Sequence, residues 1–393
     1  MTVEFARGVL PDDLPACAGG PWGVYVHVPF CASRCGYCDF NTYVLASMGP
    51  DAVADYLRSA HRELDLAASR MGDAVPQVGT IFVGGGTPTM LTPAQLGSLV
   101  GHIADLWGLA PGAEVTTEAN PETLSEPVLV GLLEAGVNRL SMGMQSADRS
   151  VLRVLDRVHT PGRAVEMALA ARKVGFDDVS LDLIFGAPGE TLDSWRRTLG
   201  TTLEAEPDHV SAYSLIVEEG TRLAARIRRG ELPMTDEDDL ADKYLLAEEV
   251  LTDAGLANYE VSNWARPGHR SEHNLGYWLG RDWWGVGPGA HSHVNGLRWW
   301  NHKRPARYAE LLDAGLLPVE DGERLTAEQR HEETVLLALR LAEGLPLAEL
   351  TDVEQNRAAR VVTDGLGAVQ GGRLRLNLRG RLLADRIITE LLA

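Results

Sequence analysis

Three cysteines close together in the sequence are the residues best suited to chemistry. Cys31, Cys35 and Cys38 follow an apolar run of β-forming residues that ends at Pro29. Gly36 and the proline favour a loop over a regular helix, so the three thiolates can converge on one point. Structural zinc takes four protein ligands, whereas three thiolates on a four-iron cluster leave one iron open. The triplet therefore predicts a [4Fe-4S] cluster, with a zinc site or three unrelated buried thiols as the alternatives.

The segments after this loop alternate between strand-like and helix-like patterns. Strand-like runs lie at 22–28, 79–83, 114–119, 138–144, 178–185 and 208–217, and helical spacing occurs at about 51–70, 93–107, 125–135, 161–174 and 191–204. Such alternation requires parallel strands with right-handed crossovers. It predicts an α/β fold, a partial (β/α)6 TIM-like barrel, with a doubly wound open sheet as the alternative.

Polar groups and glycines gather where these strands end, which is where the sites of parallel α/β folds lie. A glycine-rich loop, GGGTP at 84–88, follows the second strand, and glycines let the main chain approach a ligand closely. Glu118, Gln145 and Asp182 lie at or near the ends of later strands, and Arg157 follows soon after the fourth. A buried acid needs a partner, and a bound ligand would supply one. A tight turn, a surface ion pair or a helix cap is the alternative for each.

Composition narrows the classes of function. Of 393 residues, 55 are acidic and 36 basic, a formal charge of −19, which argues against nucleic-acid binding and against broad attachment to anionic lipid. The N-terminus does not resemble a signal peptide, and no apolar run approaches the ~20 residues of a spanning helix. Four cysteines do not make a disulfide framework, and Cys17 is interpreted as an incidental thiol. These features predict a cytoplasmic protein with at most peripheral membrane association.

The pattern loosens after about residue 218. We expect four parts: an N-terminal tail (1–21), a core barrel (22–255), a segment rich in glycine, tryptophan and histidine (256–310) and a C-terminal module (311–393). In the module, helical patterns at 326–341 and 353–364 precede a short β-ribbon and a final helix. This order favours a small α+β, winged-helix-like domain, which the acidic charge argues is not DNA-binding.

The cysteine spacing, with Tyr37 just before the third cysteine, resembles the cluster loop of the radical S-adenosylmethionine (SAM) superfamily. The blocks VYVHVPFC, GGGTPT, TTEANPE, NRLSMGMQ, DRVHT and SLDLIFGAPGET resemble the family of oxygen-independent coproporphyrinogen III oxidases (HemN) and related heme chaperones, over about 22–300. The resemblance implies that the three cysteines hold the cluster and that SAM chelates the open iron. It assigns SAM contacts to Tyr25, Tyr37, Gly85, Gly86, Thr87, Pro88, Glu118, Gln145, Arg157 and Asp182. The last three match positions that hold a second SAM in the oxidase.

Two departures separate the oxidases from the chaperones. The oxidases carry a fourth cysteine two residues after the triplet, where this chain has Phe40, and a longer segment before the first strand, which begins here at Trp22. The run HNLGYW at 273–278 matches HNxxYW, a motif of the chaperone branch. The resemblance thus implies a heme chaperone that serves hemoprotein acceptors, possesses SAM and a [4Fe-4S] cluster, forms a homodimer and is not an active coproporphyrinogen III oxidase. The oxidase, and a radical SAM enzyme with another substrate, are the alternatives.

Heme binding agrees with the composition of the segment at 256–310. A porphyrin needs apolar walls, a base for the iron and cations for its propionates. The segment offers aromatic walls and cations at Tyr277, Trp278, Trp283, Trp284, Trp299, Trp300, Arg270, Arg281 and Arg298. We predict that His273, Asn274, Tyr277 and Trp278 contact heme, with His273 favoured over His291 and His293 as the iron ligand. Ordinary core packing is the alternative for each of these side chains.

Overall fold

The computed structural model describes residues 9–11, 14–17, 20, 22–72 and 75–393. The six predicted strands form as β1 (Trp22–Val28), β4 (Val78–Gly85), β5 (Leu109–Ala119), β6 (Arg139–Gln145), β7 (Asp178–Phe185) and β8 (His209–Ser214). They are parallel neighbours in chain order, without the reversal of a doubly wound sheet. Right-handed crossovers in one direction place the connecting helices on one face and leave the other face free for a site.

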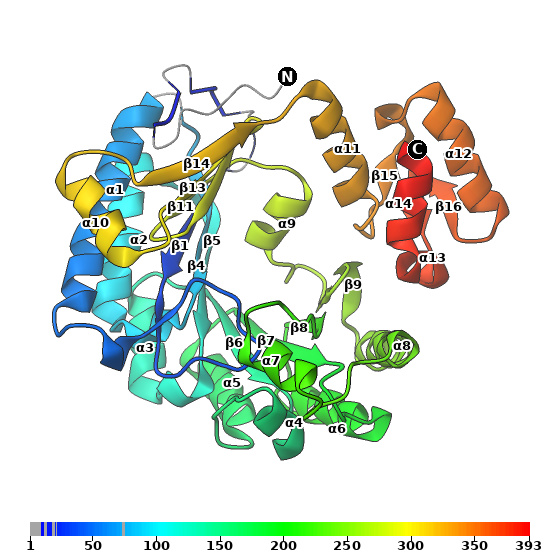
Figure 1. Ribbon diagram of the computed structural model, residues 1–393, viewed down its shortest axis with the longest axis horizontal. Coiled ribbons are helices and arrows are strands. Elements are labelled where there is room, and N and C mark those ends of the chain that lie inside the picture. The colour runs from blue at the N-terminus through cyan, green and yellow to red at the C-terminus, as the bar shows by residue number, and fades with distance from the viewer. Residues whose placement is uncertain (1–8, 12–13, 18–19, 21, 73–74) are drawn as a thin grey trace.

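Those helices lie where the periodicity predicts them, along the outside of the curved sheet (Figure 1). They are α1 (Ala52–Met71), α2 (Pro93–Trp107), α3 (Glu126–Glu134), α5 (Arg163–Val174) and α6 (Leu192–Leu203). The shorter α4 (Arg149–Val154) and α7 (Arg222–Arg228) were not predicted. α2 illustrates the local rules: Thr92 and Gln95 form a capping box, and Pro93 occupies the first turn.

The segment after α8 (Glu237–Asp253) extends the sheet at both edges, which the sequence did not predict. β9 (Ala257–Glu260) and β10 (Asn263–Ala265) continue it antiparallel beyond β8, and α9 (Glu272–Trp278) follows. β11 (Trp283–Val286) then pairs in parallel with β1, and β12 (His291–Val294), β13 (Leu297–Asn301) and β14 (Val319–Arg324) add antiparallel strands. The sheet runs from β14 at one edge to β9 at the other, so the barrel is partial, as predicted.

A buried carboxylate fixes the β11–β13 hairpins on the helical layer. Glu63 of α1 accepts hydrogen bonds from the Gly287 amide (2.8 Å), the Asn301 side-chain amide (2.6 Å) and the Tyr308 hydroxyl (2.5 Å) of α10 (Pro305–Asp313). Its side chain is buried, and burial raises its pKa to about 7. This network therefore joins segments more than 200 residues apart in the chain.

The C-terminal module has a core of its own, formed by residues between Val335 and Leu391. It contains α11 (Ala327–Ala338), α12 (Asp352–Thr363), α13 (Leu378–Leu382), α14 (Ala384–Leu392) and a small sheet of β15 (Leu345–Pro346), β17 (Arg373–Leu376) and β16 (Gly367–Gln370). This is the helix–helix–ribbon–helix order predicted for a winged-helix-like domain. The four-part division stays a prediction: β14 lies beyond residue 310 yet belongs to the central sheet, and most of the tail at 1–21 is outside the described residues. Among described helices, none has the length and apolarity needed to span a bilayer.

Candidate functional site

A cavity of about 790 Å³ lies on the free face of the sheet. The cysteine loop, the glycine-rich loop, the strand-end polar residues and α9 all contribute to its wall. Of the residues predicted for the site, those that line it are Tyr25, Cys31, Cys35, Tyr37, Cys38, Gly85, Gly86, Thr87, Glu118, Gln145, Arg157, Asp182, His273, Asn274 and Tyr277. The other two predicted residues, Pro88 and Trp278, do not line it.

The three cysteines share the wall with one hydroxyl and one guanidinium group. The Thr87 hydroxyl lies 3.9 Å from the Cys31 Sγ, and Arg157 Nη1 lies 3.7 Å from the Cys35 Sγ. Burial raises the pKa of the Cys31 and Cys38 thiols, so an unliganded loop keeps them protonated. Cys17 packs against the main core instead, where burial raises its pKa to about 11. Among the described residues, three thiols therefore face the cavity.

The glycine-rich loop is pressed against the backbone that leads into the cysteines. Gly86 and Thr87 donate their amides to the carbonyls of Val28 (2.8 Å) and Phe30 (2.7 Å). A Cβ at Gly86 would lie 2.5 Å from the Phe30 carbonyl oxygen, and Gly85 has a φ of 109°. Side chains are thus excluded from both positions, and the main chain itself forms this part of the wall. Pro88 is buried at the start of the next short helix, η3 (Pro88–Met90).

Two carboxyl groups face the cavity from β5 and β7, which lie on either side of β6. Glu118 accepts a hydrogen bond from the Gly85 amide (3.0 Å), and Asp182 accepts one from the Ser141 hydroxyl (3.0 Å). Burial, with repulsion from Asp182, raises the pKa of Glu118 to about 8, and burial also raises the pKa of Asp182. A positively charged ligand in this cavity would stabilise both carboxylates.

Several polar atoms at the cavity lack partners within the described chain. Arg157 Nε, Asn263 Oδ1 and Asn274 Nδ2 are buried without a hydrogen bond, although buried polar groups are normally paired. Gln145 ends β6 with a φ of 64°, a left-handed conformation that non-glycine residues adopt at an energetic cost. These features indicate a cavity shaped for a polar ligand.

Helix α9, which carries HNLGYW, closes one side of the cavity. Within it, His273 is buried, and its ring nitrogens lie 2.8 Å from the Thr80 hydroxyl and 2.9 Å from the Tyr277 hydroxyl. Burial lowers the pKa of His273 to about 3, so the imidazole is neutral. Trp278 faces away and packs with the Tyr259 and Leu341 cluster. The predicted iron ligand is thus inside the wall, with both nitrogens hydrogen-bonded to the protein.

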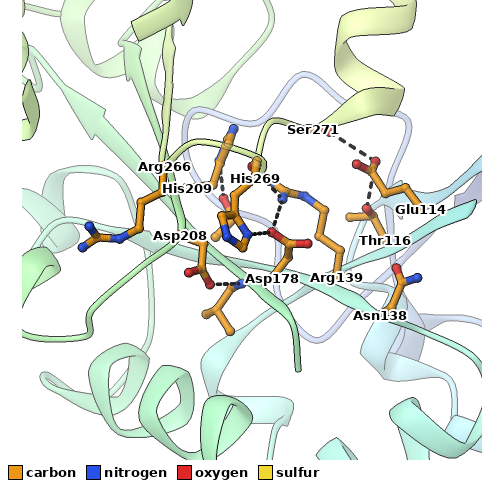
Figure 2. Close-up of polar contacts among 12 residues, drawn as sticks. Glu114, Thr116, Asn138, Arg139, Asp178, Asp208, His209, Arg266, His269 and Ser271 are labelled. Carbon is orange, nitrogen blue, oxygen red and sulfur yellow. Dashed lines mark hydrogen bonds and ion pairs between the residues drawn. The ribbon is translucent and has the colours of Figure 1, made fainter. Parts of the chain in front are cut away.

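The N-terminus of α9 is held to the sheet by a carboxylate in the middle of β5. Glu114 of β5 accepts hydrogen bonds from the amides of Glu272 (2.7 Å) and His273 (3.2 Å). Figure 2 shows Glu114 beside Ser271, which precedes this helix. It also shows His269, whose Nδ1 lies 2.5 Å from Asp178 Oδ1, and Arg139, which donates to the His269 carbonyl.

Asp178, Asp208 and His269 place potential metal ligands within 4.8 Å of one another. Arg139 lies 3.5 Å from Asp178, however, and Arg172 lies 2.8 Å from Asp208. Both carboxylates are therefore paired with arginines, and the cluster serves to fix the loop that leads into α9.

Other polar residues that line the cavity were missed by the sequence analysis: Thr116, Arg139, Ser141, His209, Ser211 and Asn263. Thr116 precedes the predicted Glu118 by two positions, and two pairs of the others, Arg139 with Ser141 on β6 and His209 with Ser211 on β8, are also spaced by two. Alternate residues of a strand share a face, so polar residues at this spacing were the signal that could have found them.

Comparison with known proteins first identifies the superfamily to which the fold and the site belong. Residues 25–201 match the model of the radical SAM superfamily, and residues 325–383 match that of the HemN C-terminal domain. The chain also superposes on coproporphyrinogen III oxidase (HemN) from Escherichia coli, described as a radical SAM enzyme, with a TM-score of 0.80 at 25% identity. That superposition covers 94% of this chain and 90% of the oxidase.

Curated relatives narrow the class to a family. The chain is 51% identical to the heme chaperone HemW of Mycobacterium tuberculosis, over 97% of this chain and 98% of that protein. It is 37% identical to the heme chaperone HemW of Bacillus subtilis, over 82% of this chain and 84% of that protein. A mitochondrial radical SAM domain-containing protein 1 from Danio rerio is 33% identical, over 98% of this chain and 90% of its own length. The protein belongs to the HemW family of radical SAM proteins.

Proposed function

We propose that the protein binds heme and transfers it to hemoprotein acceptors, with a [4Fe-4S] cluster and SAM bound in its cavity. One observation carries the proposal: the three-cysteine loop and the HNLGYW helix contribute to the wall of a single cavity. The relatives named heme chaperones, which align over nearly the whole chain, support it.

The residues fit the cluster and SAM. Cys31, Cys35 and Cys38 would hold the cluster, and no fourth cysteine faces the cavity in the described chain. Glu118 and Asp182 would face the positive groups of SAM, and Arg157, which lines the cavity near Asp182, would offer its guanidinium to an acceptor group. Bound together, the cluster and SAM would supply one-electron chemistry at a sulfonium.

The remaining predicted contacts are retained as proposals. Tyr25, Tyr37, Gly85, Gly86, Thr87 and Gln145 would form the rest of the SAM wall, with Pro88 supporting the turn from behind. His273, Asn274 and Tyr277 would present the heme-facing side of α9, and Trp278 would fix that helix to the core. To bind iron through Nε2, His273 would have to give up its hydrogen bond with the Tyr277 hydroxyl.

The rim of the cavity supports an apolar docking partner. Phe40, Val158 and Ile216 line the cavity, yet their side chains are 57%, 75% and 66% exposed. Exposed apolar groups around a mouth favour contact with another apolar surface. We assign this rim to the hemoprotein acceptor. The predicted homodimer would instead place a second copy of the chain there, and the predicted peripheral association would place a membrane surface there.

An anaerobic heme titration of the cluster-reconstituted protein, followed at the Soret band, tests the proposal. We expect saturable uptake, followed by transfer to an apo-hemoprotein. An assay with coproporphyrinogen III, reductant and SAM tests the oxidase, which the fold similarity to HemN favours and Phe40 disfavours. Absence of heme uptake, together with a decarboxylated product that Cys35→Ala abolishes, would replace the chaperone with the oxidase.

A further inference from the structure

The sheet face that lines the cavity continues onto β11–β14. Tyr25, which lines the cavity, is paired with Gly285 on β11, and Trp283 is paired with His293 on β12. His291 is paired in turn with Trp300 on β13. Residues paired across neighbouring strands point to the same side of a sheet. Trp283, His291, His293 and Trp300 therefore share the face of Tyr25, and we call these four residues the aromatic face.

The three histidines considered as iron ligands differ in whether their ring nitrogens are hydrogen-bonded to the protein. His273 is bonded to Thr80 and Tyr277. His293 Nδ1 lies 3.1 Å from the Arg281 carbonyl, and its Nε2 accepts the Gly296 amide at 3.1 Å. The His291 side chain is exposed, and within the described chain neither of its nitrogens has a hydrogen-bond partner. Only His291 can thus offer a nitrogen lone pair without breaking a protein contact.

The surroundings of His291 suit a flat anionic ligand. Its ring stacks on Trp300, with centroids 5.6 Å apart and planes 26° from parallel. Partial burial, together with the positive charges of Lys303 and Arg298, lowers the pKa of His291, which favours the neutral ring. Arg298 is paired with Glu323 and Glu333, so the exposed Lys303 is the better partner for a carboxylate.

The aromatic face also adjoins the loop that follows the cysteines. The Asn41 side chain donates to the carbonyls of Pro288 (2.9 Å) and Lys303 (2.8 Å), and the Tyr43 hydroxyl donates to the Lys303 carbonyl (3.0 Å). These hydrogen bonds tie the loop that follows the cysteines to the segments on either side of the β12–β13 hairpin that carries His291.

We propose that heme docks on the aromatic face, with His291 as an iron ligand, Trp300 as a wall and Lys303 facing a propionate. The inference rests on the proposed function, because it names where heme binds. It moves the iron ligand from the HNLGYW helix to β12 and leaves His273 as a positioning residue that fixes α9 to β4.

Heme titrations of the reconstituted wild type and of His291→Ala, His273→Ala and His302→Ala test this site. We expect His291→Ala to bind heme at least about tenfold more weakly, to show a shifted Soret band and to be restored by added imidazole. His302→Ala is the matched control, a neighbouring histidine expected to bind normally. Trp300→Leu should weaken heme and metal-free protoporphyrin IX alike, whereas His291→Ala should weaken heme alone.

These titrations distinguish failure of the proposed function from failure of the proposed heme site. No heme uptake by the wild type would overturn the proposed function, and this site with it. Normal uptake with an unshifted spectrum in His291→Ala, or equal affinity of the wild type for heme and metal-free protoporphyrin IX, would overturn the site alone. Should His273→Ala prove unstable, Thr80→Val, which removes the hydrogen bond to His273 Nδ1 and keeps the ring, is the substitute and should leave the spectrum unchanged.

Discussion

At the scale of single residues, the charge state of Glu118 governs the proposed SAM site. Its carboxyl is buried and has a pKa raised to about 8, so it is mostly neutral at lower pH. A cationic ligand binds the ionised form better, and SAM affinity should therefore rise as pH increases through about 8. Glu118→Gln should bind SAM roughly tenfold more weakly above that pH and lose the dependence. Anaerobic equilibrium dialysis of the reconstituted proteins measures both effects.

Glu122→Gln is the control for this experiment. Glu122 also lines the cavity, but it is exposed, and a hydrogen bond from the Thr160 amide lowers its pKa. Its substitution should leave the pH profile of SAM binding unchanged. A wild-type affinity that stays flat across pH 8 would contradict the role given to Glu118.

The space around two glycine residues provides a second prediction at the scale of single residues. Gly86→Ala would place a Cβ 2.5 Å from the Phe30 carbonyl oxygen, so we expect a loss of about 2 kcal/mol in stability and weaker cluster retention. Gly101, in α2, has open space around its Cβ position, and Gly101→Ala should stabilise the protein by about 0.5 kcal/mol. Denaturant unfolding and iron content compare the two. Equal effects would show that the contact at Gly86 relaxes without cost.

The sequence predicted residues whose chemistry is local and missed those whose role depends on distant partners. The cysteine spacing and the glycine loop lie within short segments, and the structure brings both to one cavity. The hydrogen bond at His273 Nδ1 is made with Thr80, which lies 193 residues away in the chain. No local pattern reveals whether a histidine nitrogen is free, so HNLGYW could not distinguish a ligand from a core imidazole.

At the scale of elements, Glu63 couples α1 to the hairpins of the aromatic face. Burial raises its pKa from an ordinary value of 4.5 to about 7, so the folded protein holds this proton more tightly than the unfolded chain. Stability is therefore full below pH 4.5 and declines as pH rises to about 7. Relative to Glu63→Gln, which cannot titrate, wild-type stability should fall by about 3 kcal/mol over this range.

Chemical denaturation of both proteins at several pH values measures this difference. Glu310→Gln on α10 is the control, because Glu310 is exposed and pairs with Arg307 on the helix surface. Parallel pH profiles for the wild type and Glu63→Gln would show that Glu63 is already ionised in the folded protein.

At the scale of the whole molecule, the order of elements was predictable, but the edges of the sheet were not. Alternating periodicities determine parallel neighbours, because each crossover returns the chain beside the preceding strand. β11 instead joins β1 from a position about 260 residues later, through a register that no local pattern encodes. This long-range pairing creates the aromatic face and brings it beside the cysteine loop.

Arg381 is one of several residues that join the C-terminal module to the barrel, and its removal should loosen the two parts. Arg381 of α13 pairs with Glu248 of α8 at 2.5 Å and also contacts Asn258, while Glu248 accepts the Trp264 indole at 2.8 Å. Arg381→Ala leaves a largely buried carboxylate without its cation, so we expect a loss of about 2 kcal/mol. Limited proteolysis should also cut faster between β14 and α11. Arg386→Ala, which breaks only the exposed pair with Glu390, should change neither. If Arg381→Ala matches it, the other contacts between the module and the barrel are sufficient to hold the module in place.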